Sequence, residues 1–268
     1  MISGRLHLRF EDIAMDGRLR LEPLTASLGL VWQDELVRHP LYPWARDQGI
    51  IPITTRFIIE GFDGPFALEG GLDVRGSWEV TRTVDATGAT QRFLLTLTTE
   101  LEGALGRTNF PPPDDAGTVR PAGRVVAEHV FTRPFAEADQ RRVTELGEFG
   151  RTARVVPFAE PRALLELPPG AKPLGPLEDD AVEHAFGLTH TDNNQHVNSL
   201  VYPRLFEEAL LRRLAPDAGL ARFLDVRYRK PSFPGDRLRL SLQPYELGGR
   251  KGAVGAFGDR VFLRMELA

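Results

Sequence analysis

Cysteine is absent from this chain of 268 residues. Its absence excludes disulfide bonds, zinc sites with cysteine ligands and a cysteine nucleophile. A signal peptide is not expected, because the first segment, MISGRLHLRFEDIAMDG, is charged from its fifth residue and has no apolar core. No apolar run approaches the roughly 20 residues that a membrane-spanning helix needs. We therefore expect a cytoplasmic protein with no membrane partner.

A strong excess of charge of one sign is also lacking. The formal net charge is −4, which gives no general reason to expect nucleic acid as a partner. The composition, 42% hydrophobic and 26% charged, is typical of a globular protein that can bury a substantial core. The length exceeds the roughly 100–200 residues of a usual domain, so we expect one large domain or two small ones.

Two halves of the chain share one order of predicted elements. In the first half a strand at Leu6–Ile13 precedes a turn at Asp16-Gly17, and a helix is predicted from apolar residues at helical spacing after it. Several strands with glycine-containing turns follow. In the second half a strand at Val182–Leu188 precedes a polar loop, a helix from about Ser199 to Leu214 and four further strands. Matching Asp16 to Asp192 gives an offset of 192 − 16 = 176 residues. The predicted first helix carries the stripe Leu21, Leu24, Leu28, Val31 and Glu35.

One strand, one central helix and several antiparallel strands are the elements of the hotdog fold. We therefore predict an α+β chain of two tandem hotdog domains, each an antiparallel sheet wrapped round a central helix. Two such sheets side by side would form an intrachain pseudo-dimer and protect the exposed sheet edges. The predicted domains are residues 1–110 and 177–268, the second carrying the site, with a turn-rich connector at 111–176.

The segment TDNNQHVNS at 191–199 is the candidate site. Pro203 is tolerated only in the first turn of a helix, so the second helix should begin near Asn198–Leu200, capped by Asn198 or Ser199. Free N–H groups of that first turn would stabilise an oxygen that becomes negative during a reaction. We expect Asn198 and Ser199 to contact the substrate there.

Asp192, Asn194 and His196 alternate along this segment. In an extended loop they would face one side together. The amide could orient a carbonyl or a water, and the carboxylate or imidazole could take a proton from that water. Because the chain has neither a cysteine nor a GxSxG pattern, direct attack by water is the simplest chemistry. His190 is a weaker second candidate.

The loop has two other interpretations, of which one stays open and the other fails. Polar loops before helices are often only caps and turns. A calcium-binding loop would need glycine at its sixth position and glutamate at its twelfth, where this chain has Val197 and Pro203. The cap interpretation therefore stays beside the catalytic one.

The motif Asp-x-Asn-x-His-Val-Asn, with a Tyr and a Glu six and twelve residues after the His, resembles the second-domain motif of plant and bacterial acyl-ACP thioesterases. The resemblance extends to the tract Leu224–Leu240, which contains FPGDRLRL, and, more weakly, to LHLRFEDIAMDGRLRL at 6–21. It implies hydrolysis of a fatty-acyl thioester, as in fatty acid biosynthesis, with Asp192, Asn194 and His196 in the site. It implies no cofactor and no metal, and an acyl carrier protein or coenzyme A as the partner that holds the acyl group.

The chain departs from this family at one place. Plant members carry a Glu-Cys pair after a Tyr-Arg-Arg tract, whereas here Tyr228-Arg229-Lys230 is followed by Pro231-Ser232. If that glutamate activates the water in the family, this chain must use Asp192 or His196 instead, be slow, or do something else. Glu208 could substitute, although its spacing from Arg204 and Arg212 is also that of a solvated helix face.

A basic excess near the site would suit an acidic carrier protein or the phosphates of coenzyme A. Between residues 204 and 239 the balance is 9 − 5 = +4. The alternative functions are a hotdog dehydratase or polyketide-processing enzyme, and a non-catalytic protein that binds an acyl group or its carrier. We also expect that two copies of the whole chain can form a homodimer. The basic residues are Arg204, Arg212, Arg213, Arg222, Arg227, Arg229, Lys230, Arg237 and Arg239, and the acidic ones are Glu207, Glu208, Asp217, Asp225 and Asp236.

Overall fold

The computed structural model describes residues 2–158, 160–214 and 219–268. The chain divides into two compact units, Met1–Phe158 and Ala159–Ala268. None of the helices in the described ranges combines the length and the apolar character that crossing a membrane requires. Each unit is built from one antiparallel sheet and one main helical segment, as the repeated order of elements predicts.

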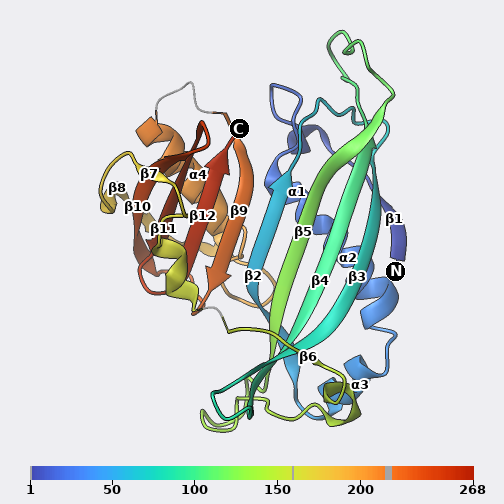
Figure 1. Ribbon diagram of the computed structural model, residues 1–268, viewed down its shortest axis with the longest axis vertical. Helices are drawn as coiled ribbons and strands as arrows, with labels where there is room; N and C mark the ends of the chain where they lie inside the picture. Colours follow the sequence, from blue (N-terminus) through green and yellow to red (C-terminus); the bar gives the residue numbers. More distant parts are fainter. Residues whose placement is uncertain (1, 159, 215–218) are drawn as a thin grey trace. The chain divides into compact units, whose positions relative to one another are not determined.

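The first unit contains a five-stranded antiparallel sheet in the order β1-β3-β4-β5-β2 (Figure 1). From Phe93 to Leu101, every second residue of β4 is buried and the residues between them are partly or fully exposed, which is the pattern of a strand with one face on the core. A two-residue strand, β6, adds in parallel to β3. The strands are β1 (Ile2–Leu6), β2 (Ile51–Gly61), β3 (Leu72–Val84), β4 (Thr90–Ala104), β5 (Val119–Thr132) and β6 (Arg154–Val155).

The predicted first helix is confirmed as a continuous helical segment over residues 21–36. The apolar stripe from Leu21 to Val31 is buried, and Glu35, at the end of the stripe, is partly exposed. Gly76 of β3 lets the helix approach the sheet, because a β-carbon there would lie 2.4 Å from Cγ2 of Val31. The segment comprises α1 (Leu21–Leu24), a 3-10 turn (Thr25–Ser27), α2 (Leu28–Val31) and a π-helical turn (Trp32–Leu36), and α3 (Leu41–Asp47) follows.

Two sequence predictions about the first unit need correction. The expected strand at Leu6–Ile13 lies earlier, as β1, and Phe10–Asp12 form a 3-10 turn instead. The expected connector at 111–176 contains β5, which pairs with both β4 and β2, and the first unit continues to Phe158. Pro121 and Gly123 made the start of β5 read as coil, but the strand is held by neighbours on both sides.

The second unit contains a sheet in the order β9-β12-β11-β10, with β7 and β8 both paired to β10. A 3-10 helix, η5 (Pro161–Leu165), packs Leu164 against Ala256 and Phe262 on one face of this sheet. The strands are β7 (Lys172–Pro173), β8 (Glu178–Ala185), β9 (Ala221–Tyr228), β10 (Arg237–Leu247), β11 (Arg250–Phe257) and β12 (Val261–Leu267).

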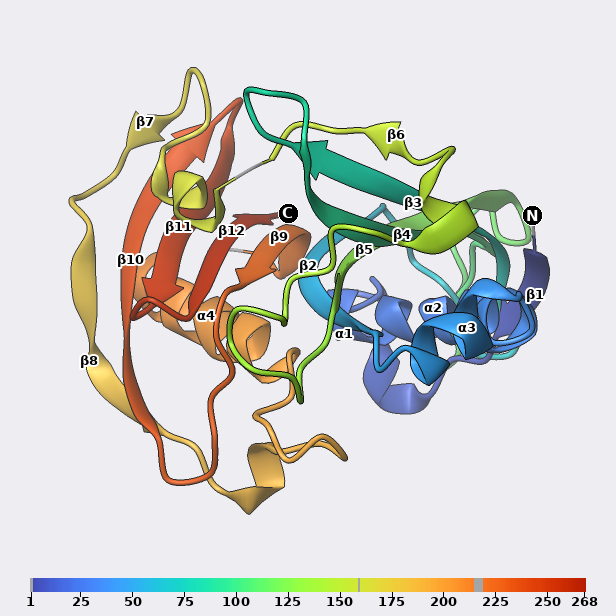
Figure 2. The ribbon, with the colours of Figure 1, turned by 90° about the horizontal axis from the view of Figure 1, so that it is seen from below.

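The second helix, α4 (Val201–Leu214), begins within two residues of the predicted start and covers the other face of this sheet (Figure 2). Tyr202, Phe206, Ala209 and Leu210 of the predicted stripe are buried. Gly255 of β11 leaves room for Phe206, since a β-carbon there would lie 2.7 Å from the ring. The amphipathic pattern therefore set both the position and the buried face of this helix.

Candidate functional site

Residues 190–198 form a tight hairpin rather than the extended loop that the sequence suggested. Thr191 and Val197 are bridged in antiparallel fashion. The N–H of Asn198 donates to the carbonyl of His190 at 2.8 Å, and the N–H of Asp192 donates to the carbonyl of His196 at 3.1 Å. A 3.0 Å bond from Gln195 N–H to Asp192 O closes the turn. The extended-loop prediction was wrong because these bonds fold the segment back on itself.

The hairpin nevertheless places Asp192 and His196 on one face. Directly opposed residues of an antiparallel pair share a face, and the face alternates along each strand. Thr191 and Val197 form one such pair, and Val197 is 6% exposed, so that pair faces the core. Asp192 and His196 therefore lie on the outer face, and both are partly exposed. Asn194 lies at the exposed tip and does not share this pairing.

The side chains of Asp192 and His196 are not joined to each other by a hydrogen bond or ion pair in the described structure. The Asp192 carboxylate accepts the N–H of Asn194 at 2.8 Å, which stabilises the turn. The His196 ring meets the ring of Phe233 edge-on, with centroids 5.1 Å apart. Both side chains thus keep hydrogen-bonding capacity toward solvent or a ligand.

Asn198, one of the two residues predicted to cap the second helix, closes the turn that leads into α4. Its side-chain oxygen accepts the N–H of Leu200 at 2.9 Å, and its carbonyl accepts the N–H of Val201 at 3.1 Å. The carbonyl of Ser199 accepts the hydroxyl of Tyr228 at 2.8 Å. Burial raises the pKa of Tyr228, so its hydroxyl keeps the proton that it donates. The contact of Asn198 and Ser199 with substrate stays a prediction.

The segment at 231–236, where the thioesterase family has its acid, supports the hairpin. The Ser232 carbonyl accepts the N–H of Val197 at 2.8 Å, and the Ser232 side chain is fully buried. The Asp236 carboxylate accepts the N–H of Phe233 at 3.0 Å and is paired with Arg260. These two contacts, the Phe233 N–H first, hold the pKa of Asp236 below its usual range. Asp236 is therefore held as a structural anion.

Glu208 lies exposed on α4, as expected for a solvated helix face. Arg212 on the same helix does not pair with it but bonds to Asp180 of β8 at 2.6 Å. Among the described residues no hydrogen bond or ion pair joins Glu208 to the hairpin, so nothing marks it as a substitute for the missing acid.

The basic excess counted along residues 204–239 is largely balanced in space. Strand β8 and the β11–β12 turn bring acids that lie outside the counted range. A count along the sequence could not find these partners, because they come from strands that are neighbours only in the folded sheet. The pairs are Arg212–Asp180, Arg213–Glu178, Arg229–Asp259, Lys230–Asp259 and Arg237–Glu183.

The first unit contains the same hairpin, and the structure shifts the repeat offset from 176 to 178. Ile13 and Leu19 are bridged as Thr191 and Val197 are, and 191 − 13 = 197 − 19 = 178. Gly17 has a φ of 87° where Gln195 has 62°. The matching bonds of the first hairpin are Ala14 N–H to Arg18 O at 2.8 Å, Gly17 N–H to Ala14 O at 2.9 Å and Arg20 N–H to Asp12 O at 3.0 Å.

This comparison shows that the hairpin backbone does not depend on the polar residues of the second unit. At the positions of Asp192 and His196 the first unit has Ala14 and Arg18 and still makes the same bonds. The interpretation of the second segment as nothing more than a turn therefore leaves its acid and imidazole unexplained. Comparing the halves at the correct offset is the sequence signal that would have revealed this.

Gln195 is expected to be a strained position of the hairpin. Among the described residues it is the only non-glycine with a positive φ, 62°. A left-handed conformation costs an L-residue about 1–2 kcal/mol. Glycine avoids this cost, but it loses more conformational entropy on folding, which offsets part of the gain. We expect Gln195→Gly to raise the free energy of unfolding by about 0.5–1 kcal/mol in urea titrations. Asn193→Gly, at a position without a positive φ, should lower it instead, and equal losses in both variants would contradict the assignment of strain.

No protein-family model matches the sequence, and no curated protein matches it either. Solved structures do match it in fold. A 12:0-ACP thioesterase from Umbellularia californica is 13% identical, with a TM-score of 0.61 over 99% of this chain and 95% of that one. An acyl-ACP thioesterase from Bacteroides thetaiotaomicron is 14% identical, with a TM-score of 0.61 over 99% and 96%. A proposed oleoyl thioesterase from Lactobacillus plantarum is 14% identical, with a TM-score of 0.61 over 99% and 93%.

These similarities extend over both units, and each unit separately has the sheet and the central helix that the sequence predicts. The resemblance to the acyl-ACP thioesterases is thus confirmed at the level of the fold, and the chain has the double-hotdog fold of these three proteins.

Proposed function

We propose that the protein is a hydrolase that cleaves the thioester of a fatty acyl group held on an acyl carrier protein or on coenzyme A. The observation that carries this proposal is the outer face of the 190–198 hairpin. It holds a carboxylate and an imidazole that the same backbone in the first unit does without. The shared fold with proteins described as acyl-ACP thioesterases supports the choice of substrate class.

In the proposed mechanism Asp192 or His196 takes a proton from a water molecule. The water oxygen then bonds to the carbonyl carbon of the thioester, and the carbonyl oxygen becomes negative. Collapse of this tetrahedral intermediate breaks the carbon–sulfur bond, and the thiolate leaves with a proton returned by the same base. Asn194, at the tip of the hairpin, would orient the water or the carbonyl.

The start of α4 would support the developing negative charge. Asn198 closes the turn before this helix and lies two residues from His196 in the same strand of the hairpin. The positive end of the helix dipole therefore lies beside the proposed reacting groups. A cytoplasmic location and a homodimer of the chain stay predictions, which cell fractionation and light scattering of the purified chain would check.

The proposed activity is tested by thiol release from acyl carrier protein and coenzyme A thioesters of several acyl lengths. We expect the folded wild-type chain to release free thiol and free fatty acid in equal amounts. The proposal fails if none of these substrates releases thiol. Elimination of water from a 3-hydroxyacyl thioester with the thioester intact would instead indicate a dehydratase. Tight binding without any turnover would indicate a non-catalytic acyl-binding protein.

A further inference from the structure

His190 occupies the position that Asp12 holds in the first unit, at the offset of 178 residues. Both residues end a 3-10 turn, η1 (Phe10–Asp12) in the first unit and η6 (Leu188–His190) in the second. Both side chains close that turn in the same way. The Asp12 carboxylate accepts the N–H of Arg9 at 2.8 Å, and Nδ1 of His190 accepts the N–H of Gly187 at 3.0 Å. The turn therefore requires a hydrogen-bond acceptor at this position, and a carboxylate can supply it.

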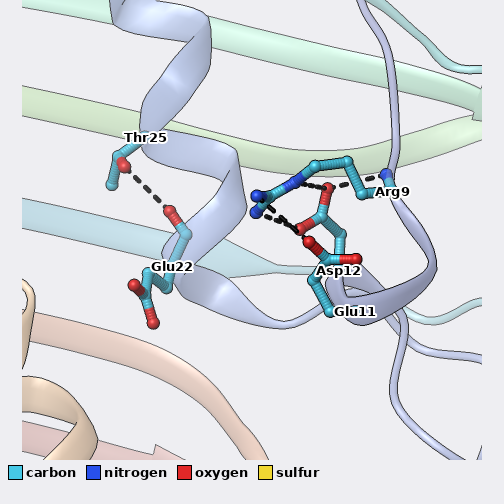
Figure 3. Close-up of polar contacts among 5 residues, drawn as sticks. All are labelled: Arg9, Glu11, Asp12, Glu22 and Thr25. Carbon is cyan, nitrogen blue, oxygen red and sulfur yellow. Dashed lines mark hydrogen bonds and ion pairs between the residues drawn. The ribbon is translucent and has the colours of Figure 1, made fainter.

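Asp12 is a fully engaged structural group (Figure 3). Its side chain is buried, and the Arg9 guanidinium binds Oδ1 at 2.8 Å and Oδ2 at 3.3 Å. Glu11 accepts from the same guanidinium at 3.1 Å. Both carboxylate oxygens of Asp12 thus accept hydrogen bonds within the first unit, and the buried side chain is not available to a ligand.

In the part of the chain that the structure describes, only one of the two ring nitrogens of His190 is bonded to the protein. The residue at the Arg9 position is Gly187, so no guanidinium covers the ring. The imidazole lies edge-on to Phe186, with centroids 5.9 Å apart, and the residue is partly exposed. Because Nδ1 accepts an N–H, the neutral ring must carry its proton on Nε2. Within the described residues Nε2 has no protein partner.

The hairpin fixes where this free donor lies. The carbonyl of His190 accepts the N–H of Asn198, which closes the turn before α4. The pair His190–Asn198 has the same parity in the hairpin as Asp192–His196, and, unlike the buried Asp12, His190 is partly exposed. A donor held at this position is suited to bind an oxygen on which negative charge develops.

We propose that His190 is a catalytic residue whose Nε2–H binds the carbonyl oxygen of the thioester and stabilises the oxyanion. This inference rests on the proposed hydrolase function. His190 transfers no proton in this role, because Nδ1 is occupied by the Gly187 N–H and Nε2 already carries hydrogen. Aspartate at this position, as in the first unit, would close the turn equally well but would repel the oxyanion.

Replacement of His190 by Asp tests this role, since the variant keeps the acceptor that Asp12 provides and loses the donor. We expect kcat for thiol release to fall by about 10²–10³-fold with KM little changed. His190→Asn, with one acceptor and one donor, should keep an intermediate kcat. Thr189→Ala, an exposed neighbour in the same 3-10 turn, is the matched control and should keep wild-type activity.

Nitrogen-15 NMR of the imidazole shows which ring nitrogen of His190 carries the proton, independently of any activity measurement. We expect the neutral His190 ring to carry its proton on Nε2, with the resonance assigned by its loss in His190→Asn. A folded His190→Asp variant within about twofold of wild-type kcat would overturn the inference and leave the hydrolase proposal intact. A proton found on Nδ1 would overturn it as well. A wild-type chain that releases no thiol would overturn both, and if His190→Asp fails to fold, the kcat of His190→Asn decides.

Discussion

Replacing His196 with alanine is expected to lower kcat for acyl-thioester hydrolysis by about 10²–10⁴-fold, the usual contribution of a general acid or base. The His196 imidazole lies on the outer face of the hairpin, partly exposed and against Phe233. No hydrogen bond of this ring builds the turn, whose bonds at this residue come from the backbone. The loss should therefore appear in kcat rather than in stability, and steady-state thiol release with a urea titration of the same variant measures both.

The first unit supplies a matched control for His196→Ala. Arg18 holds the same place in the first hairpin, where its carbonyl accepts the N–H of Ala14. Arg18→Ala removes a side chain from an identical backbone outside the proposed site, so activity should stay near that of the wild type. If His196→Ala kept full activity, His196 would leave the site assignment, whereas the hydrolase proposal would stand. Asp192→Asn then distinguishes which of the two groups is the base, since the amide keeps the acceptor for Asn194 N–H but takes up no proton.

Phe206→Ala is expected to lower the free energy of unfolding of the second unit by about 3–5 kcal/mol. Phe206 is 0% exposed at the centre of α4, and Gly255 of β11 leaves space for its ring. Removing the ring leaves a cavity that the sheet cannot close, because the strand beneath it already has no side chain at Gly255. Since α4 begins at the candidate hairpin, the same change should also loosen the site.

The distribution of tryptophan makes this loss measurable in one unit at a time. All three tryptophans, Trp32, Trp44 and Trp78, belong to the first unit. Circular dichroism should therefore show an early transition in urea for Phe206→Ala while tryptophan fluorescence keeps its wild-type midpoint. Equal shifts of both signals would mean that the two units unfold together. Glu208→Ala, an exposed change on the same helix, should stay within about 0.5 kcal/mol of the wild type, and a Phe206→Ala loss below about 1 kcal/mol would contradict the packing described.

Local patterns in the sequence were sufficient for the two long helical segments, although not for α3, and they singled out the segment proposed as the site. The stripe from Tyr202 to Leu210 and the place of Pro203 located α4 to within two residues, because helical periodicity and the position of proline depend on residues within a few positions of one another. The order of elements in each half was sufficient for the fold class, which the similar solved structures confirm.

Pairing between distant residues was decided only by the tertiary structure. The strand β5 was read as connector because its start contains Pro121 and Gly123, and only its bonds to β4 and β2 make it a strand. The arginines that seemed to form a basic patch find their acids on strands far away in the sequence. The role of His190 was hidden because alternation in an extended chain cannot show which atom of an imidazole is already bonded. The sequence by itself thus determined which segment gathers the acid, amide and imidazole side chains. The pairing within the hairpin decided which of them share a face. Only the tertiary structure could decide this, because register and hydrogen-bond partners are fixed by contacts that no local pattern encodes.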